Sequence, residues 1–234
     1  MPELPDLEVI AEFLQRELAG VRIEGASILK PIVVRNLTGD DLTAGLVGQC
    51  IQTVSRRGEF LLLPLSSGDW LVINPMLAGR LRYHPANEKA GGKPFLVLRL
   101  ANGMSLRYSD AAMMGKVYLT WSLELVPGFA GQGPEALDPQ LTLDAFAARL
   151  RRHHGEIKGI LTNQSFVAGI GNAYADEILF CARVYPFRKR PSLSEDEARR
   201  IYECMHTVLE EAVETLRQRL TNFCRTCQPG TIIR

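Results

Sequence analysis

The chain has 234 residues, of which 46% are apolar and 23% are charged, and its formal net charge is +1. This is the composition of an ordinary soluble globular protein, with enough length for one large domain or two modest ones. No apolar run is long enough to span a bilayer, and the N-terminus lacks the pattern of a signal peptide. Because the net charge is close to zero, any nucleic-acid surface has to come from local clusters of Arg and Lys.

The five cysteines are scattered along the chain, apart from Cys224 and Cys227, and their number is odd. This pattern favours a reducing compartment over a disulfide framework. We therefore expect a cytoplasmic protein with no membrane partner.

The first part of the chain predicts a helix followed by a β domain. Apolar positions from Leu4 to Leu18 recur at helical spacing, and Gly20 is a suitable stop. Residues 21–121 contain short apolar and alternating runs separated by turn signals, of which Asn102-Gly103 is a strong hairpin signal. These runs predict an antiparallel β-sandwich of roughly eight strands.

Glycine and proline are concentrated in residues 122–140, which predicts a linker or hinge. Beyond it, apolar positions return to helical spacing. The expected helices cover residues 141–152, 157–163, 172–181 and 194–217. The first is capped by Thr142 or Asp144, and the last opens with the capping box Ser194-x-x-Glu197. A cleft between a β domain and a helical domain is a usual place for a site.

Four segments of the chain resemble the formamidopyrimidine-DNA glycosylase and endonuclease VIII family. Pro2-Glu3-Leu4-Pro5-Asp6 is similar to that family's N-terminus, and residues 167–180 (VAGIGNAYADEILF) resemble its helix–two-turn–helix signature. Residues 133–137 (GPEAL) resemble its hinge, and residues 223–228 (FCRTCQ) resemble the closing half of its zinc finger. The matches keep the family's order over nearly the whole chain.

The resemblance implies an α+β multidomain fold. An N-terminal catalytic domain, an antiparallel β-sandwich with an N-terminal helix, would cover residues 1–121. A hinge over 122–140 would lead to a helix–two-turn–helix DNA-binding domain over 141–217. A partial zinc-finger tail, without regular structure, would follow over 218–234. The partner would be double-stranded DNA that contains oxidised bases or abasic sites, bound by a monomer associated with the nucleoid.

The resemblance assigns the chemistry to Pro2 and Glu3. Loss of Met1 leaves Pro2 with a secondary amine, and since an α-amino group titrates at roughly 7.7–8.0, part of it is a free nucleophile at neutral pH. Attack on the sugar C1′ would displace the base and leave an iminium cation, which promotes phosphate elimination. The Glu3 carboxylate is suited to protonate the opened sugar oxygen. Taken alone, Pro-Glu simply begins many helices; the distant helical signature favours the catalytic interpretation.

The same resemblance assigns the DNA contacts. Lys158 and Asn172 would hold phosphates beside the lesion, and Gly171 would let backbone amides approach a phosphate at a helix N-terminus. Arg57 is a further candidate phosphate ligand, and Arg219 matches an arginine of the zinc finger. For Lys158 the alternative is a solvated surface lysine.

Two apolar residues are expected to fill the gap left by the flipped nucleotide. By position in the family these wedges are Leu77 and Met114, whose side chains suit insertion between base steps. The alternative is that both are ordinary core residues.

The chain departs from the family pattern at its DNA contacts. Glu59 stands where the family usually has a phosphate-binding lysine, and a carboxylate repels a phosphate; Arg57 could compensate. Ala112 and Met113 replace two arginines, of which the first reads the base opposite the lesion. Loss of that arginine should relax opposite-base choice by about 1–3 kcal/mol.

The family's zinc ion needs four ligands, and the matching segment supplies only Cys224 and Cys227. Cys204 and His206 are the other soft ligands nearby, within an expected helix. Either the protein has lost the metal, or the sequence omits a segment before Gln218. We favour omission, since a finger without zinc has little reason to keep both cysteines. A loop that closes over 8-oxoguanine would lie in the same stretch, so recognition of that base is not asserted.

The leading functional hypothesis is a bifunctional DNA glycosylase and AP lyase that acts on oxidised bases. The first alternative is a degenerate family member that binds damaged or abasic DNA without efficient cleavage. A second alternative is a nucleic-acid module that shares only the helix–two-turn–helix, as in some ribosomal and topoisomerase proteins.

Overall fold

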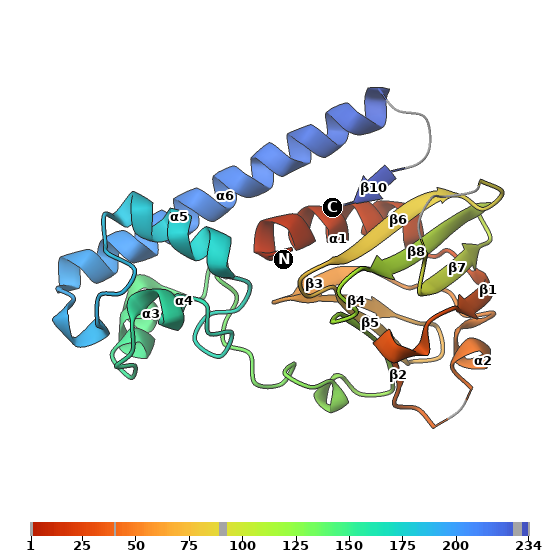
Figure 1. Cartoon of the computed structure of the whole chain (residues 1–234), viewed down its shortest axis with the longest axis horizontal. Helices are drawn as coiled ribbons and strands as arrows, with labels where there is room; N and C mark the ends of the chain where they lie inside the picture. The colour runs from red at the N-terminus through yellow and green to blue at the C-terminus, as the bar shows by residue number, and fades with distance from the viewer. Residues whose placement is uncertain (1, 40, 89–92, 227–230, 234) are drawn as a thin grey trace.

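The computed structural model describes residues 2–39, 41–88, 93–226 and 231–233. Figure 1 shows a β-sandwich with helix α1 against it, a separate group of helices, and a long linker between them. The elements in chain order are α1 (Leu4–Leu18), β1 (Ile23–Ile28), η1 (Pro31–Val33), β2 (Val34–Asn36), α2 (Leu42–Leu46), β3 (Ser55–Arg57), β4 (Phe60–Pro64), β5 (Trp70–Asn74), β6 (Gly79–Pro85), β7 (Leu96–Leu100), β8 (Met104–Asp110), β9 (Lys116–Thr120), η2 (Leu123–Leu125), α3 (Leu143–Leu150), α4 (Ile157–Leu161), α5 (Asn172–Ala182), η3 (Arg190–Ser192), α6 (Glu195–Thr226) and β10 (Thr231–Ile233). Among these helices none is both long and apolar enough to cross a bilayer.

The β-sandwich consists of two sheets with the strand orders β1-β7-β8-β6-β10 and β2-β9-β5-β4-β3. The predicted sandwich with an N-terminal helix is confirmed, but it is not antiparallel throughout. The short strand β2 runs parallel to β9. The expected Asn102-Gly103 turn does join β7 to β8, and Gly103 has the positive φ of 78° that such a turn requires.

Helix α1 belongs to two hydrophobic cores at once. Leu7, Ile10 and Leu14 are buried in the core of the β-sandwich. Leu4 and Val9, on the other side of the helix, are buried in the core of the helical domain. Full burial of a leucine contributes roughly 1.5–3 kcal/mol, so both domains hold this helix. The N-terminus of the chain is therefore fixed at the junction of the two domains.

The linker after β9 lies on the outer face of the second sheet. Val126 is buried with Phe60 and Tyr118, and Phe129 packs edge-to-face on Phe60 with ring centroids 5.5 Å apart. This segment is rich in glycine and proline but is not a flexible linker over this stretch, because its apolar side chains pack against the sandwich.

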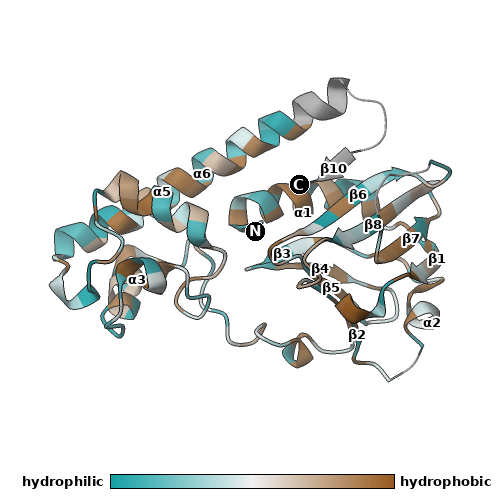
Figure 2. Ribbon diagram, viewed as in Figure 1, coloured by the Kyte–Doolittle hydropathy of each residue, from teal (hydrophilic) through white to brown (hydrophobic). Residues whose placement is uncertain are grey.

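Helix α6 continues beyond its predicted end. The sequence analysis ended it near Arg217, whereas the described helix reaches Thr226 and is followed by strand β10, which pairs with β6. The tail assigned over 218–234 is thus helical in its first part. The physical reason is in the sequence: no Gly or Pro interrupts it before Pro229, and Leu216 and Leu220 continue the buried face of the helix. Figure 2 shows the resulting alternation of hydrophobic and hydrophilic residues along α6.

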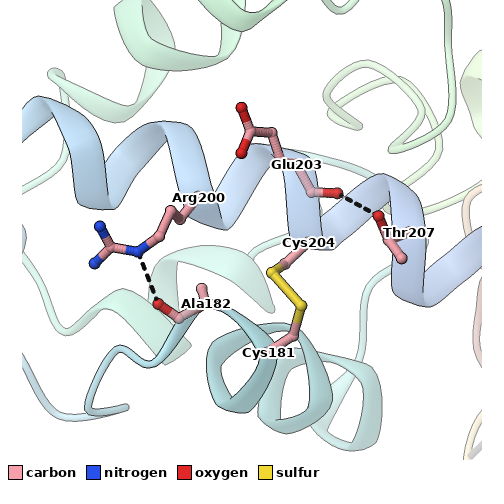
Figure 3. Close-up of a disulfide and its surroundings, with 6 residues drawn as sticks. All are labelled: Cys181, Ala182, Arg200, Glu203, Cys204 and Thr207. Carbon is pink, nitrogen blue, oxygen red and sulfur yellow. Dashed lines mark hydrogen bonds between the residues drawn. A yellow bond between two sulfur atoms is a disulfide. The ribbon is translucent and has the colours of Figure 1, made fainter.

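The expectation of unpaired cysteines was wrong for one pair. Cys181 at the end of α5 is joined to Cys204 in α6 by a disulfide, with Cα atoms 5.9 Å apart (Figure 3). Sequence spacing could not show this pairing, because it depends on how the two helices pack. Beside it, the Arg200 guanidinium donates to the carbonyl of Ala182, which also joins the C-terminal end of α5 to α6.

We expect this disulfide to stabilise the helical domain. Its cysteines are 23 residues apart in sequence, and a loop of that length corresponds to about 3 kcal/mol of stabilisation in the chain-entropy model. Thermal unfolding should therefore show a lower melting temperature after reduction, and a C181S/C204S variant should melt low with or without reductant. Cys50→Ser removes a cysteine that is free in the described part of the chain and is the matched control. Equal melting temperatures for the wild type and the double variant would contradict this prediction.

Candidate active site at the domain junction

The carboxylate of Glu3 lies between the two domains, against the N-terminal end of α5. Its Oε2 accepts hydrogen bonds from the amides of Gly171 at 2.9 Å and Tyr174 at 3.1 Å, and its Oε1 accepts one from Ala173 at 2.9 Å. Glu3 is 4% exposed. A helix N-terminus favours negative charge, and its first amides have no partner within the helix. Glu3 therefore acts as an N-terminal cap for a helix about 170 residues away, as the separations of 168 to 171 show.

Two glycines make this approach possible. Gly169 has a φ of 95°, and a Cβ atom there would lie 2.9 Å from the side chain of Leu4. A Cβ atom on Gly171 would lie 2.5 Å from the carboxyl carbon of Glu3. The Leu4 amide also donates to the carbonyl of Gly169 at 2.8 Å. The sequence analysis assigned this turn to a phosphate, but here its glycines admit the N-terminus of the chain, and the Gly171 amide is already bonded to Glu3.

The surroundings of Pro2 and Glu3 are acidic. Pro2 is half-buried, and Asp6 accepts a hydrogen bond from the Glu3 amide at 3.0 Å. Burial, followed by the negative charges of Asp6 and Glu3, raises the pKa of Tyr174 to about 12. The Tyr174 hydroxyl thus remains protonated at neutral pH. The positive charge of Arg219 acts to lower the pKa of the same hydroxyl, so Arg219 lies near this junction.

A group of ion pairs joins the β3–β4 hairpin to the hinge and to α1. Arg56 is bonded to Glu8 at 2.7 Å and to Glu135 at 2.5 Å, with a side chain only 7% exposed. Arg57 is bonded to Glu135 at 2.7 Å and to the carbonyl of Gly133 at 2.5 Å. The sequence analysis did not assign a role to Glu135, although the Gly-Pro-Glu of the hinge was a signal for it. These bonds hold the two domains in one relative position.

Loss of Arg56 should destabilise the protein. Arg56→Ala leaves Glu8 and Glu135 without the cation between them, and the remaining bond from Arg57 reduces the cost to about 3 kcal/mol. We expect a melting temperature lower by roughly 6–12 °C, measured by thermal unfolding. Arg16→Ala is the control, because Arg16 is 64% exposed and its pair with Glu17 is weak. If both variants melt alike, the ion pairs do not join the domains as described.

The other expected DNA ligands have different surroundings. Lys158 is half-buried and is bonded at 2.8 Å to Asp176, whose side chain is exposed, so both interpretations of this lysine stay open. Asn172 is exposed at the first position of α5, and Arg219 is exposed on α6. Arg57 uses two of its five N–H groups on the hinge, and its side chain is 30% exposed. Lys158, Asn172 and Arg219 therefore remain the candidate DNA contacts on the helical side.

The two expected wedges are exposed on the β domain. Leu77, in the loop between β5 and β6, is 54% exposed, and Met114, between β8 and β9, is 42% exposed. This excludes the interpretation that they are core residues. Met113 is 46% exposed with a φ of 56°, and Ala112 is exposed beside it. The second loop thus presents small and apolar side chains in the place of the two missing arginines.

The two cysteines of the zinc site that the resemblance implied lie outside the side chains that the structure describes. Cys227 is outside the described residues, and only the backbone of Cys224 is described. Cys204 is bonded to Cys181. His206 is about 18 residues from Cys224 along a continuous helix, which corresponds to roughly 27 Å. Within the described part of the chain no cluster of His, Cys, Asp or Glu could hold a metal ion.

A β-sandwich joined to a helix–two-turn–helix domain, with the N-terminal residues at the junction, defines a two-domain class of DNA repair glycosylases. Two family models cover most of the chain. Formamidopyrimidine-DNA glycosylase N-terminal domain matches residues 1–117, and Formamidopyrimidine-DNA glycosylase H2TH domain matches residues 132–223. The chain belongs to the formamidopyrimidine-DNA glycosylase family. Since the match includes the N-terminal domain, a module that shares only the helix–two-turn–helix is excluded.

Relatives and solved structures agree with this assignment. The formamidopyrimidine-DNA glycosylase of Desulforamulus reducens is 36% identical over 217 residues, which are 92% of this chain and 78% of that protein. That of Pelotomaculum thermopropionicum is 34% identical over 216 residues, with the same coverage of 92% and 78%. The Lactococcus lactis enzyme bound non-covalently to DNA with an AP site is similar at a TM-score of 0.83 and 27% identity, over 91% of this chain and 82% of that chain.

Proposed function

We propose that this protein is a DNA glycosylase with AP lyase activity that excises oxidised bases through a Schiff base at Pro2 and cleaves the strand by β/δ-elimination. The observation that carries the proposal is the position of Glu3, which is held by three amides of the helical domain beside Pro2. A nucleophile needs a nearby group that moves protons, and these two residues form such a pair. Its place of action would be the DNA of a bacterial cell, since the relatives are bacterial.

The substrate would lie between the two domains. Lys158, Asn172 and Arg219 would contact phosphates, and Leu77 and Met114 would enter the base stack from the β domain. This placement is supported by the similarity, at a TM-score of 0.83, to a mutant of the Lactococcus lactis enzyme in complex with DNA containing Fapy-dG. The proposal assigns no step to zinc.

A second candidate is a protein that binds damaged or abasic DNA without efficient cleavage. Two observations favour it. Glu59, Ala112 and Met113 stand where the family usually has cationic residues that contact DNA, and Arg57 is bonded to Glu135 and to the carbonyl of Gly133 in the hinge. This candidate keeps the DNA surface and leaves Glu3 as a cap of α5 only, but it assigns no role to the N-terminal proline beside it.

Cleavage assays on defined duplexes distinguish the two candidates. The duplexes carry 8-oxoguanine, formamidopyrimidine, dihydrouracil or an abasic site, each opposite each of the four bases. We expect cleavage at the abasic site and excision of at least one oxidised base, with weak dependence on the opposite base because the loop at Ala112 lacks an arginine. Tight binding without cleavage of any duplex would favour the second candidate.

A further inference from the structure

The turn between β3 and β4 brings a second acidic residue, Glu59, to the domain junction. The amide of Gly58 donates to Glu135 at 2.6 Å. A Cβ atom on Gly58 would lie 3.4 Å from the Cβ of Ala168, which precedes the glycine turn that contacts Glu3. Figure 1 shows this hairpin pointing toward the helical domain beside the N-terminal end of α1. Glu59 is half-buried and lies close enough to Glu3 for their charges to interact.

The two carboxyl groups differ in their hydrogen bonds. Both oxygens of Glu3 accept bonds from backbone amides, which a carboxylate accepts better than a carboxylic acid does. For Glu59, by contrast, no side-chain hydrogen bond or ion pair is found among the residues that the structure describes. Glu59 is thus the member of the pair that is free to carry a proton.

The charged groups around the hairpin do not neutralise Glu59. They are Arg56, Arg57, Glu8, Glu135, Glu3, Asp6, Tyr174 and, on the helical side, Lys158, Asp176 and Arg219. Arg56 and Arg57 are bonded to Glu8 and Glu135, and Lys158 is bonded to Asp176. The charge of Arg219 acts on the Tyr174 hydroxyl, whereas the charge that acts on Glu59 is that of Glu3.

We propose that Glu59 is the proton donor for the departing base, whereas Glu3, held by the amides of α5, acts on the sugar. This inference rests on the proposed glycosylase function. In the step, the lone pair of the Pro2 nitrogen forms a bond to C1′ and the bond from C1′ to the base breaks. The electron pair of that bond takes the proton of Glu59, so the base leaves neutral. The Pro2 nitrogen loses its own proton to solvent, from which Glu59 is protonated again.

The titration of Glu59 agrees with this role. Burial, followed by the negative charge of Glu3, raises the pKa of the Glu59 carboxyl above its ordinary value. More of it is therefore protonated near neutral pH than for an exposed glutamate, which suits a general acid. Excision that depends on this acid falls as pH rises through the pKa of Glu59, whereas protonation of the Pro2 amine lowers the rate at the acidic end.

A comparison of two substrates tests the proposal. A duplex with an oxidised base requires the base to leave, whereas a duplex with a preformed abasic site does not. We expect Glu59→Gln to lower the ratio of base excision to abasic-site cleavage by on the order of 100-fold, and to remove the fall of excision at high pH. Glu59→Asp keeps a carboxyl and should restore part of the excision. Glu24→Gln, exposed on β1, is the control for an acid-to-amide change.

Each outcome decides between the alternatives. If Glu59→Gln lowers both reactions equally, or leaves the pH profile of excision unchanged, Glu59 is not the acid. Cleavage of abasic DNA by the wild type without excision of any base would overturn the role of Glu59 and leave the lyase part of the proposed function intact. If the wild type cleaves neither substrate, the proposed function itself fails.

Discussion

A form of the protein whose N-terminus is extended by a short tag should fail to cleave abasic DNA. The extension converts the Pro2 nitrogen into an amide, whose lone pair is delocalised and does not attack a sugar carbon. Cleavage and borohydride trapping should both fall to background, while binding to the same duplex, measured by fluorescence anisotropy, should persist because the phosphate contacts of the helical domain are unchanged.

Two controls separate chemistry from steric obstruction by the tag. The same tag at the C-terminus should leave cleavage intact. A protease site placed directly before Pro2 should allow activity to return when the extension is removed. Cleavage by the uncut, extended protein at the wild-type rate would show that the Pro2 amine is not the nucleophile.

Substitution of Glu3 should have the next largest effect. Glu3→Gln keeps the size of the side chain but replaces one oxygen by an amino group that cannot accept a hydrogen bond. At least one of the amides of Gly171, Ala173 and Tyr174 would then lack its acceptor, and the group that moves protons at the sugar would be lost. We expect the single-turnover rate on abasic DNA to fall by roughly 10²–10⁴-fold.

The control for this substitution is Glu17→Gln on the same helix, where the side chain is 32% exposed and paired only with Arg16. It should cleave like the wild type. The melting temperature of Glu3→Gln should be measured in parallel, because the lost bonds also join the two domains. A Glu3→Gln protein that is folded and cleaves abasic DNA at the wild-type rate would contradict the role of Glu3.

Features with a local cause could be predicted from the sequence. The apolar spacing of α1, the Asn102-Gly103 hairpin and the capping box of α6 each depend on neighbouring residues, and the structure confirms all three, with Ser194 and Glu197 bonded reciprocally. The parallel pairing of β2 was not predicted, because three residues give no periodic signal. The end of α6 was placed too early, although no Gly or Pro interrupts the chain before Pro229.

Features with a distant cause could not be predicted in this way. The sequence shows Gly169 and Gly171, but only the fold shows that Leu4 and Glu3 fill the space that a Cβ would occupy. Their assignment to a phosphate was therefore reasonable from the local pattern and incomplete. The same limit applies to Glu59. The sequence shows that a glutamate stands where the family usually has a lysine, but only the folded structure shows that this residue lies near Glu3.

The most direct test of the account is to locate the covalent bond between protein and DNA. The native protein is incubated with abasic duplex in the presence of borohydride, digested, and the adduct is assigned by mass spectrometry. The account predicts that the sugar remnant is attached to the nitrogen of Pro2 in the N-terminal peptide. Attachment to a lysine such as Lys158, or the absence of any adduct under conditions in which the DNA is bound, would contradict it.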